Sequence, residues 1–122
     1  GGYLKVVSGN QSYLITVQHG RMNSNNTWRE IDRLSSVYPQ AELIALGHDH
    51  NLAHRRTGSL NLDKNGNEYV KVLHQVRTGT YLAYADYARN LGFPPTLIGS
   101  PIIKFEPGKH NIEVDINTLS WA

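Results

Sequence analysis

The 122-residue sequence has no cysteine, a single methionine and only two tryptophans. The absence of cysteine excludes disulfide scaffolds, thiolate-based zinc or iron–sulfur sites and cysteine nucleophiles. No apolar run approaches the ~20 residues that a membrane-spanning helix needs, which excludes an integral membrane protein with helical spans. The chain has little excess charge, with 12 basic and 10 acidic residues. This balance and a hydrophobic content of 39% exclude a wholly disordered chain.

The length is that of a single domain, and we interpret residues 1–122 as one unit. The pI of about 9.0 is compatible with a nucleic-acid partner. However, the basic residues are spread along the chain, with only short pairs such as Arg55–Arg56, so the sequence itself shows no clustered phosphate-binding surface. The chain starts with Gly1–Gly2 and without methionine, from which we expect it to be part of a longer protein, and we expect that protein to be cytoplasmic.

The first half of the chain has the pattern of a strand, a helix and a second strand. Tyr13–Val17 and Leu43–Leu46 are continuous apolar runs, typical of strands buried on both faces. Between them, Thr27 and Glu30 fit a capping box, and the apolar positions from Trp28 to Tyr38 recur at helical spacing before Pro39. This order predicts an α/β fold in which the two strands are parallel.

The second half predicts mainly antiparallel structure. Asn65–Gly66 is a turn signal between the predicted strands Ser59–Leu62 and Tyr69–Val76. A short helix is predicted over Tyr81–Leu91. A final hairpin is predicted around Pro107–Gly108, and its strands are Ile102–Phe105 and Ile112–Ile116.

Three of the six histidines follow predicted strands directly. His19 comes after the first apolar run, and His48 and His50 come after the second. Because the carboxyl ends of parallel strands meet at one edge of a sheet, the three imidazoles are expected at the same edge. Imidazole is a common ligand of zinc, iron, nickel and manganese-type ions, so this edge is a candidate metal site. Taken singly, His19 is better explained as a strand-end residue that hydrogen-bonds to a loop, and His48 and His50 as residues of a polar turn. The metal site is predicted from the three together, in their order and at strand ends.

The segments LITVQHG (14–20) and LIALGHDH (43–50) resemble the last two metal motifs of the calcineurin-like metallophosphoesterases, and RTGTY (77–81) resembles the glycine-containing segment that follows them. The resemblance implies part of a two-sheet β-sandwich flanked by helices, to which the antiparallel hairpins predicted above are added at the C-terminal end. It also implies hydrolysis of phosphomonoesters or phosphodiesters with two divalent metal ions of the Mn, Zn, Fe or Ni type. Carried over by position, His19 and His48 bind one ion and His50 binds the other.

The three earlier motifs of that family, D-x-H, G-D-x-x-D and G-N-H-[DE], do not occur in the chain. We therefore interpret the chain as the C-terminal half of such an enzyme and expect it to be inactive alone. Its expected partners are the missing N-terminal half, a phosphoester substrate that includes nucleic acid among the candidates, and a second copy of itself. The alternative is a non-catalytic binding or assembly module that retains a remnant or structural metal site.

Other residues are candidates for binding substrate. Arg55 and Arg56 have the guanidinium chemistry to hold a phosphate, although a solvated surface pair is an equal alternative. His54 is a candidate substrate or outer-sphere group, with simple exposure as the alternative. We expect His74, in phase with Val72 and Val76, to be partly buried and hydrogen-bonded, and we expect His110 to be solvated.

Overall fold

The computed structural model describes residues 2–19, 27–47, 52–78 and 101–116. They form a mostly-β α/β fold with one short helix, α1 (Thr27–Val37). The strands are β1 (Leu4–Ser8), β2 (Gln11–Gln18), β3 (Leu43–Leu46), β4 (Leu52–Leu62), β5 (Glu68–Thr78), β6 (Ile102–Phe105) and β7 (Ile112–Asp115). The predicted helix over 81–91 lies outside the described residues. No helix in the described part of the chain is long and apolar enough to cross a membrane.

Five strands form one mixed sheet in the order β1-β2-β3-β5-β4. The central strands β2, β3 and β5 are parallel, whereas β1 and β4 pair antiparallel at the two edges. The predicted parallel strand–helix–strand unit is therefore confirmed. Strands β6 and β7 form a separate antiparallel hairpin, as predicted for the C-terminal part of the chain.

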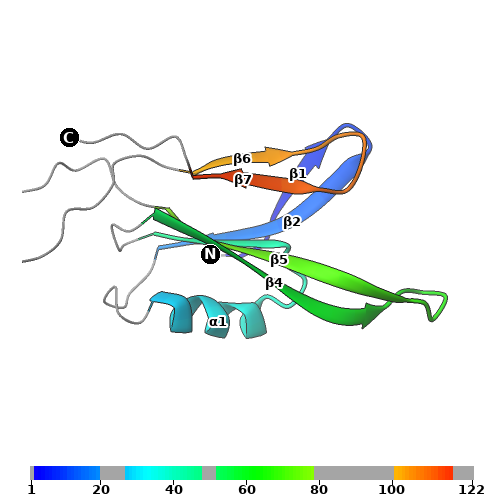
Figure 1. Cartoon of the computed structure of the whole chain (residues 1–122), viewed down its shortest axis with the longest axis horizontal. Coiled ribbons are helices and arrows are strands. Elements are labelled where there is room, and N and C mark those ends of the chain that lie inside the picture. Colours follow the sequence, from blue (N-terminus) through cyan, green and yellow to red (C-terminus); the bar gives the residue numbers. More distant parts are fainter. Residues whose placement is uncertain (1, 20–26, 48–51, 79–100, 117–122) are drawn as a thin grey trace, which may run out of the picture.

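Helix α1 covers one face of the sheet, which we call the helix face (Figure 1). Its apolar side packs on β3, with the buried residues Ile31, Leu34, Ala41, Ile44 and Leu46. Trp28 and Tyr38 pack against this cluster, which confirms that the apolar stripe of the helix faces the core. Pro39 follows the helix end at Val37, as expected from a residue that cannot donate a backbone hydrogen bond.

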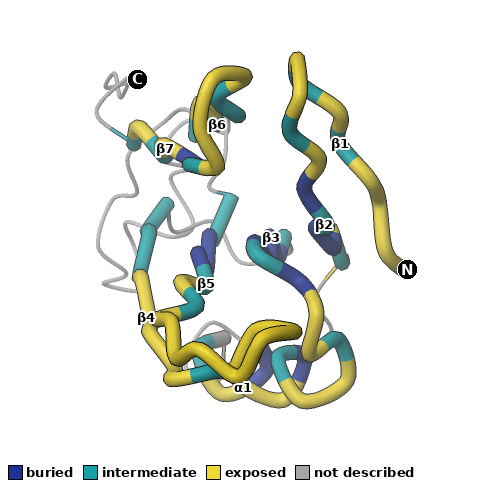
Figure 2. Tube along the Cα trace, turned by 90° about the vertical axis from the view of Figure 1, so that its right-hand side faces the viewer, coloured by how far each residue is buried: buried dark blue, intermediate teal, exposed yellow. Residues whose placement is uncertain are grey.

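The β6–β7 hairpin covers the opposite face, which we call the hairpin face (Figure 1). The core there consists of Tyr13, Ile15, Leu43, Ala45, Val76 and Ile112. Viewed along the layers, burial is highest on the central strands and lowest on the edge strands β1 and β4 (Figure 2). Gly9, at the β1–β2 turn, has a φ of 56° and lies so close to Pro107 that a built β-carbon would be 2.6 Å from the proline Cβ.

Two predictions about the strands need correction. The run Tyr13–Val17 is not buried on both faces throughout, because Val17 is 50% exposed. It points to the hairpin face near the end of β2, beyond the buried Tyr13 and Ile15. The hairpin at Asn65–Gly66 exists, but its strands are longer than predicted and extend back to Leu52 and forward to Thr78. The long β4–β5 ladder carries part of the candidate site.

Candidate functional site

The carboxyl ends of the parallel strands meet at one edge of the sheet, which we call the carboxyl edge. Gln18 is paired with Leu46, and Leu46 is paired with Arg77. The antiparallel strand β4 begins at the same edge, with Ala53 opposite Arg77. Residues that follow β2 and β3 therefore leave the sheet side by side, as the strand–helix–strand pattern predicts.

His19 lies at this edge, exposed, immediately after β2. Gly47 follows β3, and its backbone N donates to Gln18 O at 3.0 Å. A β-carbon built on Gly47 would lie 3.9 Å from His19 Nδ1 and 3.6 Å from Thr78 Oγ1. The imidazole of His19 is thus next to Gly47, the residue that precedes His48 in the sequence. An exposed imidazole has the donor chemistry of a transition-metal ligand.

The other two predicted ligands, His48 and His50, lie outside the described residues. Among the residues that the structure describes, no group of three or more histidine or acidic side chains could hold a metal ion. The structure therefore places His19 beside Gly47, and the rest of the predicted ligand set stays a prediction.

Arg55 and Arg56 are adjacent in β4, so their side chains point to opposite faces of the sheet. Arg55 lies on the helix face, where its Nε donates to Gln75 Oε1 at 2.6 Å and its Nη2 donates to Asp32 Oδ1 at 2.6 Å. Arg56 is exposed and is paired with His74 across the ladder, on the hairpin face. The two guanidinium groups are therefore not brought together to hold one phosphate.

A cationic cluster forms instead on the helix face, around the ring of Trp28. The Arg55 guanidinium carbon is 4.4 Å from the ring centroid, and that of Arg77 is 5.3 Å from it. Stacking on the indole orients both groups by cation–π attraction. Arg77 was not among the predicted site residues. Its only sequence signal was its position in the segment 77–81, and its meeting with Arg55 depends on the pairing of β4 with β5.

His54 and His74 form a pair on the hairpin face. His54 Nε2 is 3.0 Å from His74 Nδ1, and the rings lie within 8° of parallel. His74 is only 6% exposed, so the prediction that it is buried and hydrogen-bonded is confirmed. Burial lowers the pKa of His74 to about 4, assisted by the nearby His54 and Arg56 and opposed by Glu42. Burial, and then Arg56, also lower the pKa of His54.

His110 was expected to be solvated, and its side chain is 48% exposed. It also has specific contacts, because its ring stacks on Tyr13 with the centroids 4.3 Å apart. Its Nδ1 is 2.9 Å from Gln11 Oε1, and its Nε2 contacts Glu42 Oε1. The imidazole fixes the β6–β7 loop to the sheet because it combines an aromatic face with two polar nitrogens, a role that a loop position does not reveal in the sequence.

No family model, no curated protein and no solved structure matches this chain.

Proposed function

We propose that this chain is part of a metal-dependent phosphoesterase and that it supplies the histidine ligands His19, His48 and His50. The proposed fold is part of a two-sheet sandwich of the calcineurin-like metallophosphoesterase type, with the β6–β7 hairpin belonging to the second sheet. Two divalent ions held there would activate a water molecule and polarise the phosphoryl group. The chain's own residues would position the ions and the anionic substrate.

One observation carries this proposal: His19 and Gly47 lie side by side at the carboxyl edge. Two segments 28 positions apart in the sequence, each with a glycine next to a histidine, leave adjacent parallel strands there. A glycine at such a point allows the backbone to turn sharply directly after a buried strand. The arrangement supports the assignment of both segments to one ligand set.

The charged residues near the edge support an anionic substrate. Arg77 precedes the last residue of β5, and Arg55 lies on the next strand. Asp32 pairs with Arg55 through a 2.6 Å contact. A phosphate at the carboxyl edge would lie near both guanidinium groups, whose planar N–H donors suit phosphate oxygens. Arg56 and His54, on the opposite face, stay candidates for contacts with a longer substrate such as nucleic acid.

The metal ligands proposed for this chain are three imidazoles shared between two ions. A catalytic zinc site normally has about three protein ligands for each ion. We therefore propose that a partner segment, the N-terminal half of the enzyme, supplies carboxylates. It follows that the chain alone binds divalent metal weakly and does not turn over phosphoesters.

Paramagnetic Mn²⁺ tests the proposal, first in the unsubstituted full chain. At low occupancy it should broaden the ring NMR signals of His19, His48 and His50 first. The signals of His54, His74 and His110 serve as controls within the same molecule. His19→Ala should then reduce the broadening at His48.

Equal broadening of all six histidines would contradict the proposed site and favour the non-catalytic module. Sub-micromolar affinity of the isolated chain for Mn²⁺ or Zn²⁺ by calorimetry would contradict the need for a partner segment. Phosphodiester hydrolysis by the chain together with the N-terminal half, lost on His48→Ala, would support the enzyme.

A further inference from the structure

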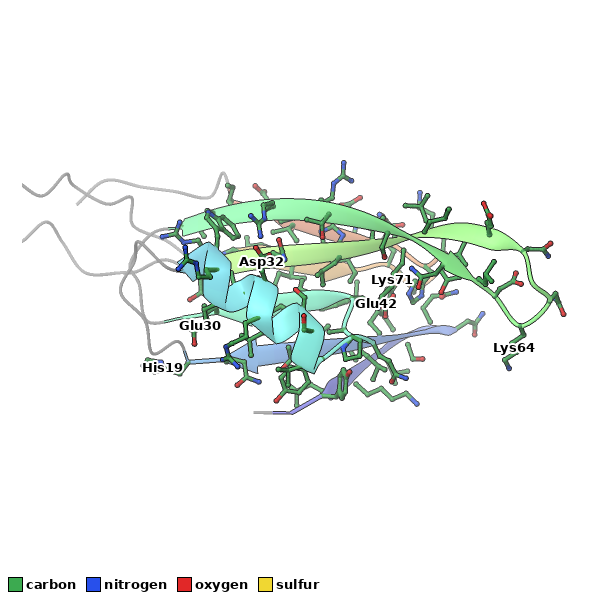
Figure 3. The ribbon with its side chains drawn as sticks, turned by 90° about the horizontal axis from the view of Figure 1, so that it is seen from below. His19, Glu30, Asp32, Glu42, Lys64 and Lys71 are labelled. Atoms are coloured by element: carbon green, nitrogen blue, oxygen red, sulfur yellow. The ribbon has the colours of Figure 1, made fainter. Side chains whose placement is uncertain are left out.

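A groove of about 360 Å³ lies on the helix face, between the second half of α1 and the β4–β5 ladder. This volume falls at the lower end of the range of pockets that bind small molecules. The groove is separate from the metal proposal, because none of its lining residues is a proposed metal ligand. Figure 3 shows Asp32 on the side of α1 that faces β4 and β5, and Lys71 closer to the β4–β5 turn, whereas His19 lies at the other end of the molecule.

The groove has an apolar floor and hydroxyl-bearing walls. Leu73 and Ala41 belong to the cluster of apolar residues under α1, and they form the floor. Ser35 comes from the helix, and Thr57 and Ser59 come from β4. Thr57 and Ser59 share the helix face because they alternate with Arg56 and Gly58 along the strand. Ser59 Oγ accepts from Asn61 Nδ2 at 2.9 Å, so its own proton is available to a ligand.

The charge in the groove is positive. Asp32 is neutralised by Arg55. Lys71 donates to the backbone oxygen of Pro39, but in the described part of the chain no carboxylate pairs with it. Its ammonium group has three donors, which leaves two for an anion at this end of the groove. The bonds from Arg55 and Gln75 both end on Oδ1 of Asp32, so Oδ2 can accept from a ligand hydroxyl.

We propose that this groove binds a small polyhydroxylated molecule with one anionic group, the class that includes sugar phosphates. The anionic group contacts Lys71, and the hydroxyls bond to Thr57, Ser59 and Asp32. The carbon skeleton lies on Leu73. A bare anion would leave the hydroxyl walls and the apolar floor unused, and a neutral sugar would leave the charge of Lys71 without an anionic partner.

The test is an amide NMR titration of the full chain with ribose 5-phosphate in the presence of EDTA. Removing metal separates this result from the metal proposal. We expect saturable shifts of the backbone amides of Thr57, Ser59 and Leu73. Ribose alone and inorganic phosphate alone should each bind more weakly than the combined ligand.

Lys71→Gln should weaken the affinity about tenfold, because a hydrogen bond to a charged group is lost. Lys64→Gln is the matched control: Lys64 is an exposed lysine in the turn of the same hairpin (Figure 3), and its loss should leave the affinity unchanged. Thr57→Val should weaken binding about threefold with little change in shape. If the NMR spectrum of Lys71→Gln shows that this variant is not correctly folded, Thr57→Val and Ser59→Ala test the proposal in its place.

Three results would overturn the proposal. The first is that ribose 5-phosphate gives no saturable shifts in the groove. The second is that inorganic phosphate binds as tightly as the sugar phosphate, which would show an anion site without a role for the hydroxyls. The third is that Lys64→Gln and Lys71→Gln weaken binding equally, which would show attraction to the overall charge of the hairpin.

Discussion

The pair formed by His54 and His74 holds one proton between its facing nitrogens. With both pKa values lowered, both rings are neutral at pH 7, so one nitrogen of the 3.0 Å contact carries the hydrogen and the other accepts it. Protonation of the second ring would place two cations in contact beside Arg56, with His74 almost fully buried. The pair is therefore a point at which acid weakens the fold.

The first prediction concerns this pH dependence. His74 binds its proton near pH 6.5 in the unfolded chain and near pH 4 in the folded one. Between these values the unfolded state binds more protons, so the free energy of unfolding falls as the pH is lowered from 6.5 to 4. The loss from this residue approaches about 3 kcal/mol. Urea unfolding across this range should show a steeper pH dependence for the wild type than for His74→Gln.

Comparing the two proteins at each pH removes the contribution of the carboxylates, which titrate in both. Parallel stability curves for the wild type and His74→Gln would contradict the prediction. They would mean that the ring is neutral or charged to the same extent in the folded and unfolded chains.

Strand length and register together explain why this pair was not predicted: the predicted strand began at Ser59, whereas β4 begins at Leu52 and so includes His54. A two-residue Asn65–Gly66 loop would leave Lys64 opposite Asn67. The structure instead pairs Leu62 with Glu68, and Asp63 Oδ1 accepts from the backbone N of both Asn65 and Asn67 at 2.9 Å. The side chain of one aspartate thereby shifts the ladder by one residue. A shift of one residue in a β ladder changes which side chains share a face.

At the level of elements, the sequence predicts the helix and strands whose apolar residues follow a regular pattern. It misses all or part of the strands at the edges of the sheet. The helix and β3 were predicted because their apolar residues follow the helical spacing and the continuous pattern of a buried strand. Strand β1 was not predicted because Leu4 and Val7 are exposed, and the strand forms by pairing with β2. Likewise, the start of β4 contains Arg55 and Arg56, which resemble a polar loop until β5 is placed beside them.

The second prediction concerns the attachment of the β6–β7 hairpin through Tyr13. This ring is fully buried, and its hydroxyl donates to Glu106 O at 2.6 Å while it accepts from Asn111 N at 3.1 Å. Tyr13→Phe removes both bonds and leaves backbone groups without partners. We expect a loss of about 1–2 kcal/mol in the free energy of unfolding.

Tyr3→Phe is the control for this substitution. Tyr3 is 40% exposed, and its hydroxyl accepts from Gln40 N at 3.1 Å, so water can replace the lost contact. Its effect should stay within about 0.5 kcal/mol. Urea unfolding measures both variants. Equal losses for Tyr13→Phe and Tyr3→Phe would show that the hydroxyl of Tyr13 does not hold the hairpin in place.

At the scale of the whole molecule, the sheet is well covered at its centre and poorly covered along β4 and β5. Leu60 is paired with Val70 across the ladder, and they are 67% and 65% exposed. Leu62 and Val72 lie on the same face and are 66% and 42% exposed. These four residues form an apolar stripe on the hairpin face, beyond the end of the core under β6 and β7. Strand β4 is also an edge of the sheet.

The last prediction is that this stripe makes the chain associate. An edge strand with exposed apolar neighbours can pair with another chain, and natural proteins often prevent this with a lysine. Light scattering of the wild type should show a mass that rises from low to high micromolar concentration. Leu60→Lys should keep the chain monomeric over that range. Asn61→Lys, which adds the same charge one residue later on the opposite face, should not. A wild type that stays monomeric at high micromolar concentration would contradict the prediction, because the stripe would then tolerate water without a second copy or a partner segment to cover it.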